Sequence, residues 1–428
     1  MEERLQDRYL RLVESHMNAV QAVAAGIHAL PGAGCSLAAT QAAWRFFKNA
    51  RSTLPTLVEP LRAVGQQVAA ESRSSHALLV HDWSKLDYDG HTSKKDLTQL
   101  SNALDWGYEL TTALLVDADH GAPLAPMALA VWAADGSHTT ESDRVQPRVA
   151  HLEQVLPWMQ ASRDWQLPRT CVHVIDREAD SARHLRAWDA DGHQFLVRAD
   201  DRRMNFRGTS QRLSQITARL EQEQAFVFTR EVDLRGRRGR QFVAETEVVL
   251  TEAGWARNSE GKKYRVPGPP LRLRLVIVQV RDEQGQLLAQ WWLLTNVWEV
   301  SADQIALWYY WRWRIESFHK LLKSAGLQAE QWQQESALAI AKRLLVAAMA
   351  CVLVWQLQRL DTPQSQECQQ FLVRVSGRQM KRSRPITTPA LLVGIHLLLT
   401  MLDVLEHYSL SQLRTFARQA VPLLRPSG

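Results

Sequence analysis

The chain has 428 residues, 46% of them hydrophobic and 22% charged, which are ordinary values for a folded protein and exclude a fibrous or largely disordered chain. This length predicts two or three domains. The 51 Lys and Arg against 45 Asp and Glu give a net charge of +6, which is compatible with a polyanionic partner but does not require one. The four cysteines form no C-x-x-C pair, so neither a zinc site nor a disulfide framework is predicted.

The first residues, Met1 to Arg4, lack the basic-then-apolar order of a secretory signal. The longest apolar stretch, from Leu344 to Trp355, is shorter than the roughly 20 residues that span a membrane. We therefore expect a buried helix there, a cytoplasmic protein and no membrane partner.

In chain order, residues 1–75 predict a small helical N-terminal domain, because apolar residues recur at helical spacing. Residues 76–199 predict the first part of an α/β core, with the element order β-β-β-α-β-α-β of a mixed sheet. The expected elements are strands at 77–80, 107–117, 126–133, 171–175 and 194–198 and helices at 144–163 and 178–189.

Residues 200–290 predict a β-rich insertion, with apolar or alternating runs at 225–233, 241–250 and 271–280. The second part of the core is expected at 291–360, helical from 302 onward. Residues 361–428 predict a helical C-terminal region with an apolar helix at 391–405, and we find no internal repeat.

Two aspartates follow buried runs that predict strands. Asp82 comes after Ala77–Val80, and Asp176 comes directly after Cys171–Ile175. Open α/β sheets bind ligands at such strand ends. On local grounds Asp82 also suits a strand-end cap, and Asp87 and Asp89 are close rivals.

The segment from Trp308 to Lys323 predicts a helix with two stripes. At 100° per residue, one stripe presents a tyrosine, an arginine, a glutamate and two lysines, and a separate stripe is apolar. By itself this pattern also fits a surface helix with ordinary ion pairs. The residues of the polar stripe are Tyr309, Arg312, Glu316, Lys320 and Lys323.

The spacing Tyr309-x2-Arg312-x3-Glu316-x6-Lys323 resembles the Y-(2)-R-(3)-E-(6)-K signature of the insertion-sequence 4 family of DDE transposases. The segment Asp176–Asp180 resembles the Asp-Arg-Glu-Ala-Asp of that family's transposon 5 branch. Further runs agree in the same order, at Ala42–Asn49, Trp291–Thr295, Arg312–Glu316 and Phe318–Lys320.

This resemblance implies an α/β (α+β) protein with an RNase H-like mixed sheet as its catalytic core, the β-rich insertion, and helical N- and C-terminal domains. It implies that Asp82, Asp176 and Glu316 are the catalytic residues and hold two Mg²⁺ ions, for which Mn²⁺ substitutes. Hard cations take such carboxylate oxygens and activate the attacking and leaving oxygens of phosphoryl transfer. At the first aspartate the family usually has Asp-Thr-Thr, whereas this chain has Asp82-Trp83-Ser84, so Asp82 rests on strand position and order alone.

The implied function is a cut-and-paste DNA transposase. It nicks the transposon ends, forms and opens hairpins, and joins 3′-OH ends to target DNA. The implied partners are double-stranded DNA, as terminal inverted repeats and as target, and a second copy of the chain. By resemblance the N-terminal domain binds DNA ends and the C-terminal helices pair two protomers, and the protein associates with the nucleoid when it is bound to DNA.

The resemblance also implies DNA contacts. Trp291 matches a tryptophan that stacks on a flipped base, although Trp292 beside it is an alternative, and each also suits a core. An arginine-rich turn suits backbone phosphates through counterion release, although a solvated loop explains it as well. The DNA-contacting residues expected are Tyr309, Arg312, Lys320, Lys323, Arg198, Trp291, Arg235, Arg237, Arg238 and Arg240.

Two other functions stay open at this point. One is a DNA-binding regulator of transposition that does not cut, and the other is an RNase H-like nuclease without strand transfer. His76, His81 and His91 have irregular spacing, which favours ordinary surface or capping roles. His319 lies off the polar stripe, so we expect it to support the site and not to bind metal.

Overall fold

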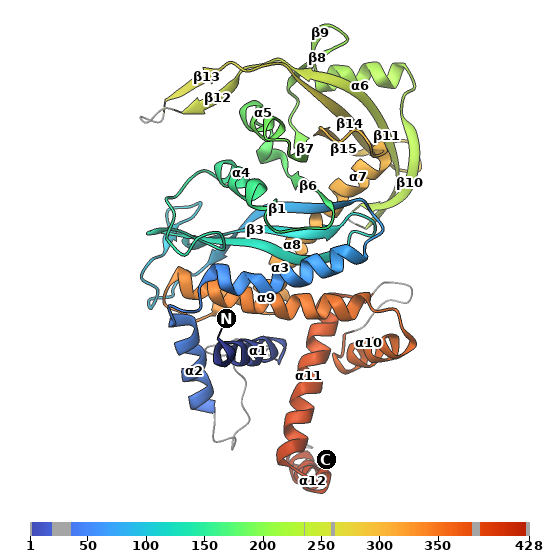
Figure 1. The fold of residues 1–428 in the computed structure, drawn as a ribbon. Coiled ribbons are helices and arrows are strands. Elements are labelled where there is room, and N and C mark those ends of the chain that lie inside the picture. Colours follow the sequence, from blue (N-terminus) through green and yellow to red (C-terminus); the bar gives the residue numbers. More distant parts are fainter. Residues whose placement is uncertain (1, 19–35, 235, 258–261, 379–385, 425–428) are drawn as a thin grey trace.

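A computed structural model describes residues 2–18, 36–234, 236–257, 262–378 and 386–424. One large mixed sheet runs through the molecule, with helices on both of its faces (Figure 1). Its strand order is β5-β4-β3-β1-β6-β7-β15-β14-β11-β8-β9, with β2 paired to β3 and β10 paired to β11.

The first half of the sheet has the RNase H-like arrangement that the sequence predicts. β1, β3 and β4 are antiparallel neighbours, and β6 and β7 then add parallel to β1. The short strands β2 and β5 were not anticipated. The strands of this half are β1 (His76–Asp87), β2 (Thr98–Gln99), β3 (Trp106–Asp117), β4 (Pro123–Ala133), β5 (Gly136–Thr139), β6 (Thr170–Ile175) and β7 (Gln194–Ala199).

The β-rich segment continues the same sheet and does not form a separate one. β15 pairs antiparallel with β7, and β14 and β11 follow, whereas β12 and β13 form a hairpin of their own. These strands are β8 (Arg203–Phe206), β9 (Thr209–Arg212), β10 (Val227–Leu234), β11 (Arg237–Leu250), β12 (Gly254–Arg257), β13 (Lys263–Val266), β14 (Leu271–Arg281) and β15 (Leu287–Thr295).

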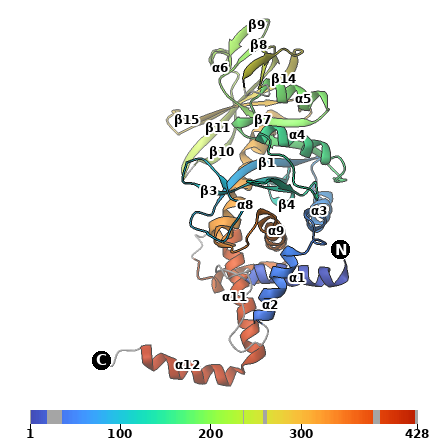
Figure 2. The same ribbon diagram turned by 90° about the vertical axis from the view of Figure 1, so that its left-hand side faces the viewer.

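Helices cover the sheet and continue beyond it. In Figures 1 and 2, α3 and α9 lie along the sheet, whereas α11 runs away from it and carries α12 at its far end. The helices are α1 (Glu3–Asn18), α2 (Ser36–Lys48), α3 (Leu54–Glu71), α4 (His151–Ala161), α5 (Ala182–Ala190), α6 (Leu213–Gln222), α7 (Ala302–Trp311), α8 (Trp313–Lys320), α9 (Ala337–Arg359), α10 (Pro363–Val375), α11 (Thr388–His407) and α12 (Leu410–Leu424).

Two of these helices are long and apolar enough to span a membrane. In α9, 89% of the apolar window is buried inside the protein, which confirms the buried helix expected at Leu344–Trp355. In α11, 28% of the corresponding window is buried. α9 is therefore a core helix, whereas α11 keeps much of its apolar surface exposed.

The buried side chains form two clusters. The larger joins α3, α9, β1, β3 and β4, and the smaller joins α5, α6, β7, β11 and β14. Gly65 lets α3 approach the sheet closely, because a Cβ at this position would lie 2.8 Å from the Met127 sulfur. The carboxylates discussed next lie where β1 and β6 meet α8.

Candidate catalytic and DNA-binding site

Asp82 and Asp176 lie at the same level on neighbouring parallel strands. β1 and β6 are in register, with Val80 beside Val174, and each aspartate follows that pair by two residues. Adjacent strands are about 4.8 Å apart, so the register alone brings these two carboxylates together.

Asp82 does not end its strand, and that part of our expectation was wrong. β1 continues to Asp87 in antiparallel pairing with β3, where Asp82 lies opposite Thr112. Only the parallel pairing with β6 stops before Asp82. Asp176 does follow the end of β6, and its Oδ1 accepts from the Glu178 backbone N–H at 2.8 Å.

Asp87 and Asp89, the two alternatives to Asp82, stabilise a turn through hydrogen bonds to backbone N–H groups. Asp87 accepts from the Asp89 backbone N–H at 3.0 Å, and Asp89 accepts from the Trp106 backbone N–H at 2.7 Å. These contacts account for Asp87 and Asp89 as turn residues.

Glu316 is linked to Asp82 by Arg312, which bonds both carboxylates. The Arg312 guanidinium donates from Nη2 to Glu316 Oε1 at 2.6 Å and from Nη1 to Asp82 Oδ2 at 3.3 Å. The Arg312 side chain is 8% exposed, against 15% for Asp82 and 39% for Glu316. A buried arginine thus bridges the first and third predicted carboxylates.

The electrostatics reflect a crowded group of acids. Burial raises the pKa of Asp82 to about 6, Arg312 opposes that rise, and the charges of Asp176 and Glu316 add to it. Like-charged carboxylates that share a site resist simultaneous ionisation. A cation beyond Arg312 would therefore be stabilised here.

The predicted helix from Trp308 to Lys323 is interrupted. α7 ends at Trp311, Arg312 is a turn residue, α8 spans Trp313–Lys320, and a π-helical turn follows at Leu321–Ala325. Arg312 nevertheless keeps right-handed helical dihedrals, and it pairs with Glu316 at the expected i,i+4 spacing. Such irregular turns are common at functional sites, and here Tyr309 and Arg312 both point inward, each 6% exposed.

Tyr309 joins this group from α7. Burial raises its pKa, while Arg312 and Arg198 lower it and Asp176 raises it further. The charges that act on Tyr309 therefore include Arg198 of β7 and Asp176. The structure thus brings together Asp82, Asp176, Glu316, Tyr309, Arg312 and Arg198.

An aromatic pocket of about 270 Å³ adjoins Tyr309. Trp291 lines it, together with Tyr310 and Trp313, which are 51% and 49% exposed. Trp292 points the other way, packs on the smaller core and donates to Thr217 Oγ1 at 2.8 Å. Of the two tryptophans, Trp291 is the one beside the carboxylates. We had not singled out Tyr310 and Trp313, although their place beside Tyr309 and Arg312 was a signal for them.

The two predicted lysines differ in their surroundings. Lys320 is exposed at the end of α8. Lys323 donates to the Lys85 backbone carbonyl at 2.5 Å and pairs with Glu330 at 2.8 Å. Since Lys85 follows Asp82 by three residues on β1, Lys323 lies close to the carboxylate group.

The arginine-rich turn joins β10 to β11. Arg235 lies outside the described residues. Arg237, Arg238 and Arg240 are exposed at the start of β11, and the Arg240 guanidinium lies 4.7 Å from the centre of the Phe228 ring. Residues Arg230–Leu234 of β10 line the aromatic pocket. The arginine-rich turn follows them directly in the chain.

His76 and His81 are buried, so the surface or capping role expected for them was wrong. His76 Nε2 pairs with Glu299 at 2.9 Å, and His81 Nε2 shares a hydrogen bond of 2.9 Å with His173. His319 is buried, lies 3.3 Å from Thr112 Oγ1, and has a pKa that burial lowers to about 3. Thr112 lies opposite Asp82, so His319 packs behind the site.

A different trio, Asp96, Asp135 and His138, is the one group within the described ranges whose ligand atoms all lie within 4.8 Å of one another. The carboxylate oxygens of Asp82, Asp176 and Glu316 therefore do not all lie within 4.8 Å of one another. The trio lies near β5, three strands from β1. Asp96 already accepts from the Tyr108 hydroxyl and from the Ala337 backbone N–H, so we assign it a structural role.

Comparison with known proteins adds three findings. No curated protein matches the chain. A cryo-EM structure of the piggyBac transposase synaptic complex with hairpin DNA aligns over 99% of this chain and 77% of that chain, with 9% identity and a TM-score of 0.34, which is too low to support an argument. The sequence model of the transposase DDE domain matches residues 127–353, a range that includes Asp176 and Glu316 but not Asp82. Because this match covers more than half of the chain, the protein belongs to the transposase DDE domain family.

Proposed function

We propose that this transposase-family protein is a cut-and-paste DNA transposase of the insertion-sequence 4 group. The observation that carries the proposal is that Arg312 bridges Asp82 and Glu316, that the charge of Asp176 acts on Asp82, and that Tyr309 of the same group lines a pocket with Trp291. Carboxylates for phosphoryl transfer and an aromatic surface for an extruded base are the two parts that such a reaction needs.

The donor set fits divalent metal ions. Three carboxylates supply only oxygen ligands, which Mg²⁺ and Mn²⁺ prefer, and burial raises the pKa of Asp82, with smaller contributions from the charges of Asp176 and Glu316. When bound, two Mg²⁺ ions would activate the attacking oxygen and stabilise the leaving 3′ oxygen. Arg312 holds Asp82 and Glu316 in place, and Asp176 is held by its own turn.

The DNA end is proposed to lie across α7, α8 and the β10–β11 turn. Trp291 and Tyr309 would receive a flipped base, since aromatic surface replaces the stacking that an extruded base loses. The cations proposed to contact phosphates through charge-assisted hydrogen bonds are Arg198, Arg312, Lys320, Lys323, Arg235, Arg237, Arg238 and Arg240.

The remaining parts of the proposal concern assembly. Residues 1–75 would bind terminal inverted repeats, 76–199 and 291–360 would form the catalytic core around the insertion 200–290, and 361–428 would pair two protomers. The exposed apolar side chains of α11, which include Met401, Leu402 and Leu405, suit such pairing. We place the protein in the bacterial cytoplasm, on the nucleoid when it is bound to DNA.

The test is incubation of the full chain with Mg²⁺ and a DNA fragment that bears the terminal inverted repeats flanking the gene. Hairpin-ended fragments and joined products are expected. Nicks without joining would replace the proposal by a nuclease. Binding without cleavage, unchanged in Asp176→Ala, would replace it by a non-cutting regulator.

A further inference from the structure

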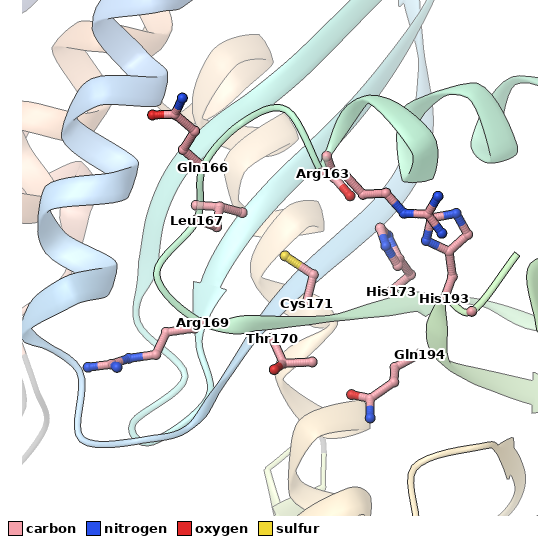
Figure 3. A pocket seen from close by; sticks show the side chains of 11 residues that line it. Arg163, Gln166, Leu167, Arg169, Thr170, Cys171, His173, His193 and Gln194 are labelled. Carbon is pink, nitrogen blue, oxygen red and sulfur yellow. The ribbon is translucent and has the colours of Figure 1, made fainter.

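A second pocket, of about 230 Å³, lies at the opposite end of the parallel strands from the carboxylates (Figure 3). The starts of β6 and β7 and the chain that follows α4 form its walls. Thr170 and Cys171 open β6, whereas Asp176 follows its last residue, so roughly 10 Å of strand separates His173, the nearest pocket residue, from Asp176. The pocket is roomier than a single water, which occupies about 30 Å³.

The lining of this pocket is basic. Four of its eleven residues are arginine or histidine, and none of the eleven is aspartate or glutamate. Arg163, His173 and His193 gather at one end of the pocket, and Arg169 extends from the other (Figure 3). The positive charge of its two arginines makes this cavity favourable for an anion.

The two histidines are buried, and their ring nitrogens are incompletely paired. His173 is 1% exposed and His193 is 5% exposed, and the rings lie perpendicular with centres 5.6 Å apart. His173 Nδ1 shares its hydrogen bond with His81 Nε2. Among the described residues, His193 Nε2 and His81 Nδ1 have no partner. Buried polar atoms normally find one, so these rings have hydrogen-bonding capacity to spare.

Burial and nearby positive charge both lower the pKa of His173 and of His193. The positive charge that acts on both rings is that of the Arg163 guanidinium. His81, in front of His173, is itself held neutral by burial. Asp191 raises the pKa of His193, but its carboxylate accepts from Gln160, and only its backbone carbonyl accepts from Arg163. A bound anion beside Arg163 would therefore add negative charge that the side chains lining the pocket do not provide.

We propose that this pocket binds a phosphate group, with Arg163 as the fixed cation and His193 and His173 as donors. Arg169 extends from the other end of the pocket, away from the two histidines (Figure 3), and its Nη2 donates to the backbone carbonyls of Ala70 and Ser72. The phosphate comes either from a DNA backbone or from a free phosphate compound. The inference stands apart from the proposed catalytic function, because the pocket shares no residue with the carboxylate site.

The experiment uses the full chain in metal-free buffer without phosphate or sulfate. Calorimetric titration with inorganic phosphate, at one fixed pH for every variant, measures binding. Arg163→Gln should weaken it by about tenfold or more, as loss of a charge-assisted hydrogen bond does. The matched control is Arg183→Gln on α5, an exposed arginine paired with Glu153 outside the pocket, and it should bind as the parent does.

A second titration distinguishes the two sources of phosphate. With a short duplex of unrelated sequence, a DNA source predicts that Arg163→Gln weakens binding and reduces the salt slope by about one. A free-phosphate source predicts unchanged duplex binding and weaker inorganic phosphate binding. If Arg163→Gln matches Arg183→Gln with both probes, the proposal is wrong. Both titrations are run without metal and measure binding alone, so failure of the catalytic proposal would leave this result intact.

Discussion

The two ends of strand β6 collect opposite charges. Beyond its last residue, Asp176 meets Asp82 and Glu316, whereas His173 and the start of the strand meet Arg163 and His193. At the first end the buried Arg312 bridges two of the three acids, and at the second two imidazoles lie beside Arg163. Burial therefore raises the pKa of Asp82 and lowers that of His173, although the two residues lie on paired strands.

The largest effect is expected from a substitution in the acidic end, the group of Asp82, Asp176 and Glu316 beyond the last residue of β6. Glu316→Ala should lower DNA cleavage by about 1,000-fold or more, because a metal-binding carboxylate acts as part of a unit. Binding to terminal repeats, measured by gel shift, should stay close to that of the parent. Glu367→Ala on α10, which removes an exposed carboxylate, is the control. Equal loss of binding and cleavage would show that Glu316 is structural.

The next effect concerns Arg312. In metal-free buffer Arg312→Ala should lower the free energy of unfolding by about 3 kcal/mol, because it leaves two partly buried carboxylates without their counter-charge. Added Mn²⁺ should restore part of that loss. Urea unfolding with and without Mn²⁺ measures both quantities. A loss that Mn²⁺ does not change would mean that the acids hold no metal.

Lowering the pH should act on the acidic end through Asp82. Its folded pKa of about 6 lies above the ordinary value of 3.8, so the metal-free folded state binds this proton more tightly than the unfolded chain. Ionisation of Asp82 therefore costs stability as the pH rises from about 4 to about 6. Metal must displace the proton, so Mg²⁺ affinity should fall about tenfold per pH unit below about 6. Calorimetric titration of Mg²⁺ against pH gives the slope, and Asp82→Asn should abolish it.

The smallest effect concerns the basic end, the pocket of Arg163, His173 and His193, and is measured as a change of stability with pH. The pKa of His173 is lowered well below its ordinary 6.5, so below about pH 6.5 the unfolded chain takes up a proton that the folded state refuses. Stability should then fall with the pH by about 1 kcal/mol per unit. Phosphate should reduce this loss in an Asp82→Asn background, in which the acidic end no longer titrates, and Arg163→Gln should remove the phosphate effect. Thermal unfolding at stepped pH values records both.

Much of the acidic end could be predicted from the sequence, because each part of it leaves a local pattern. Strand-length apolar runs precede Asp82 and Asp176, and the order of the strands gives the RNase H-like sheet. The turn at Arg312 could not be predicted, since helical spacing holds on both sides of it. Pairing with β3 likewise extends β1 beyond the apolar run that marked it.

The basic pocket left no such pattern. Arg163 follows α4, His173 lies within β6 and His193 precedes β7, so only the fold brings them together. The same holds for Asp96, Asp135 and His138 beside β5. A lone arginine or histidine in a sequence gives no indication of which others will surround it.

The register between β1 and β6 sets a strict limit on how the gene can vary. Side chains alternate between the two faces of a strand, so His81 and Trp83 face α4, whereas Asp82 faces Arg312. A single codon lost or gained between Val80 and Asp82 would turn the aspartate toward α4 and bring a histidine or tryptophan to Arg312. Length changes in this family member are therefore expected in its loops, while β1 tolerates substitution but not insertion.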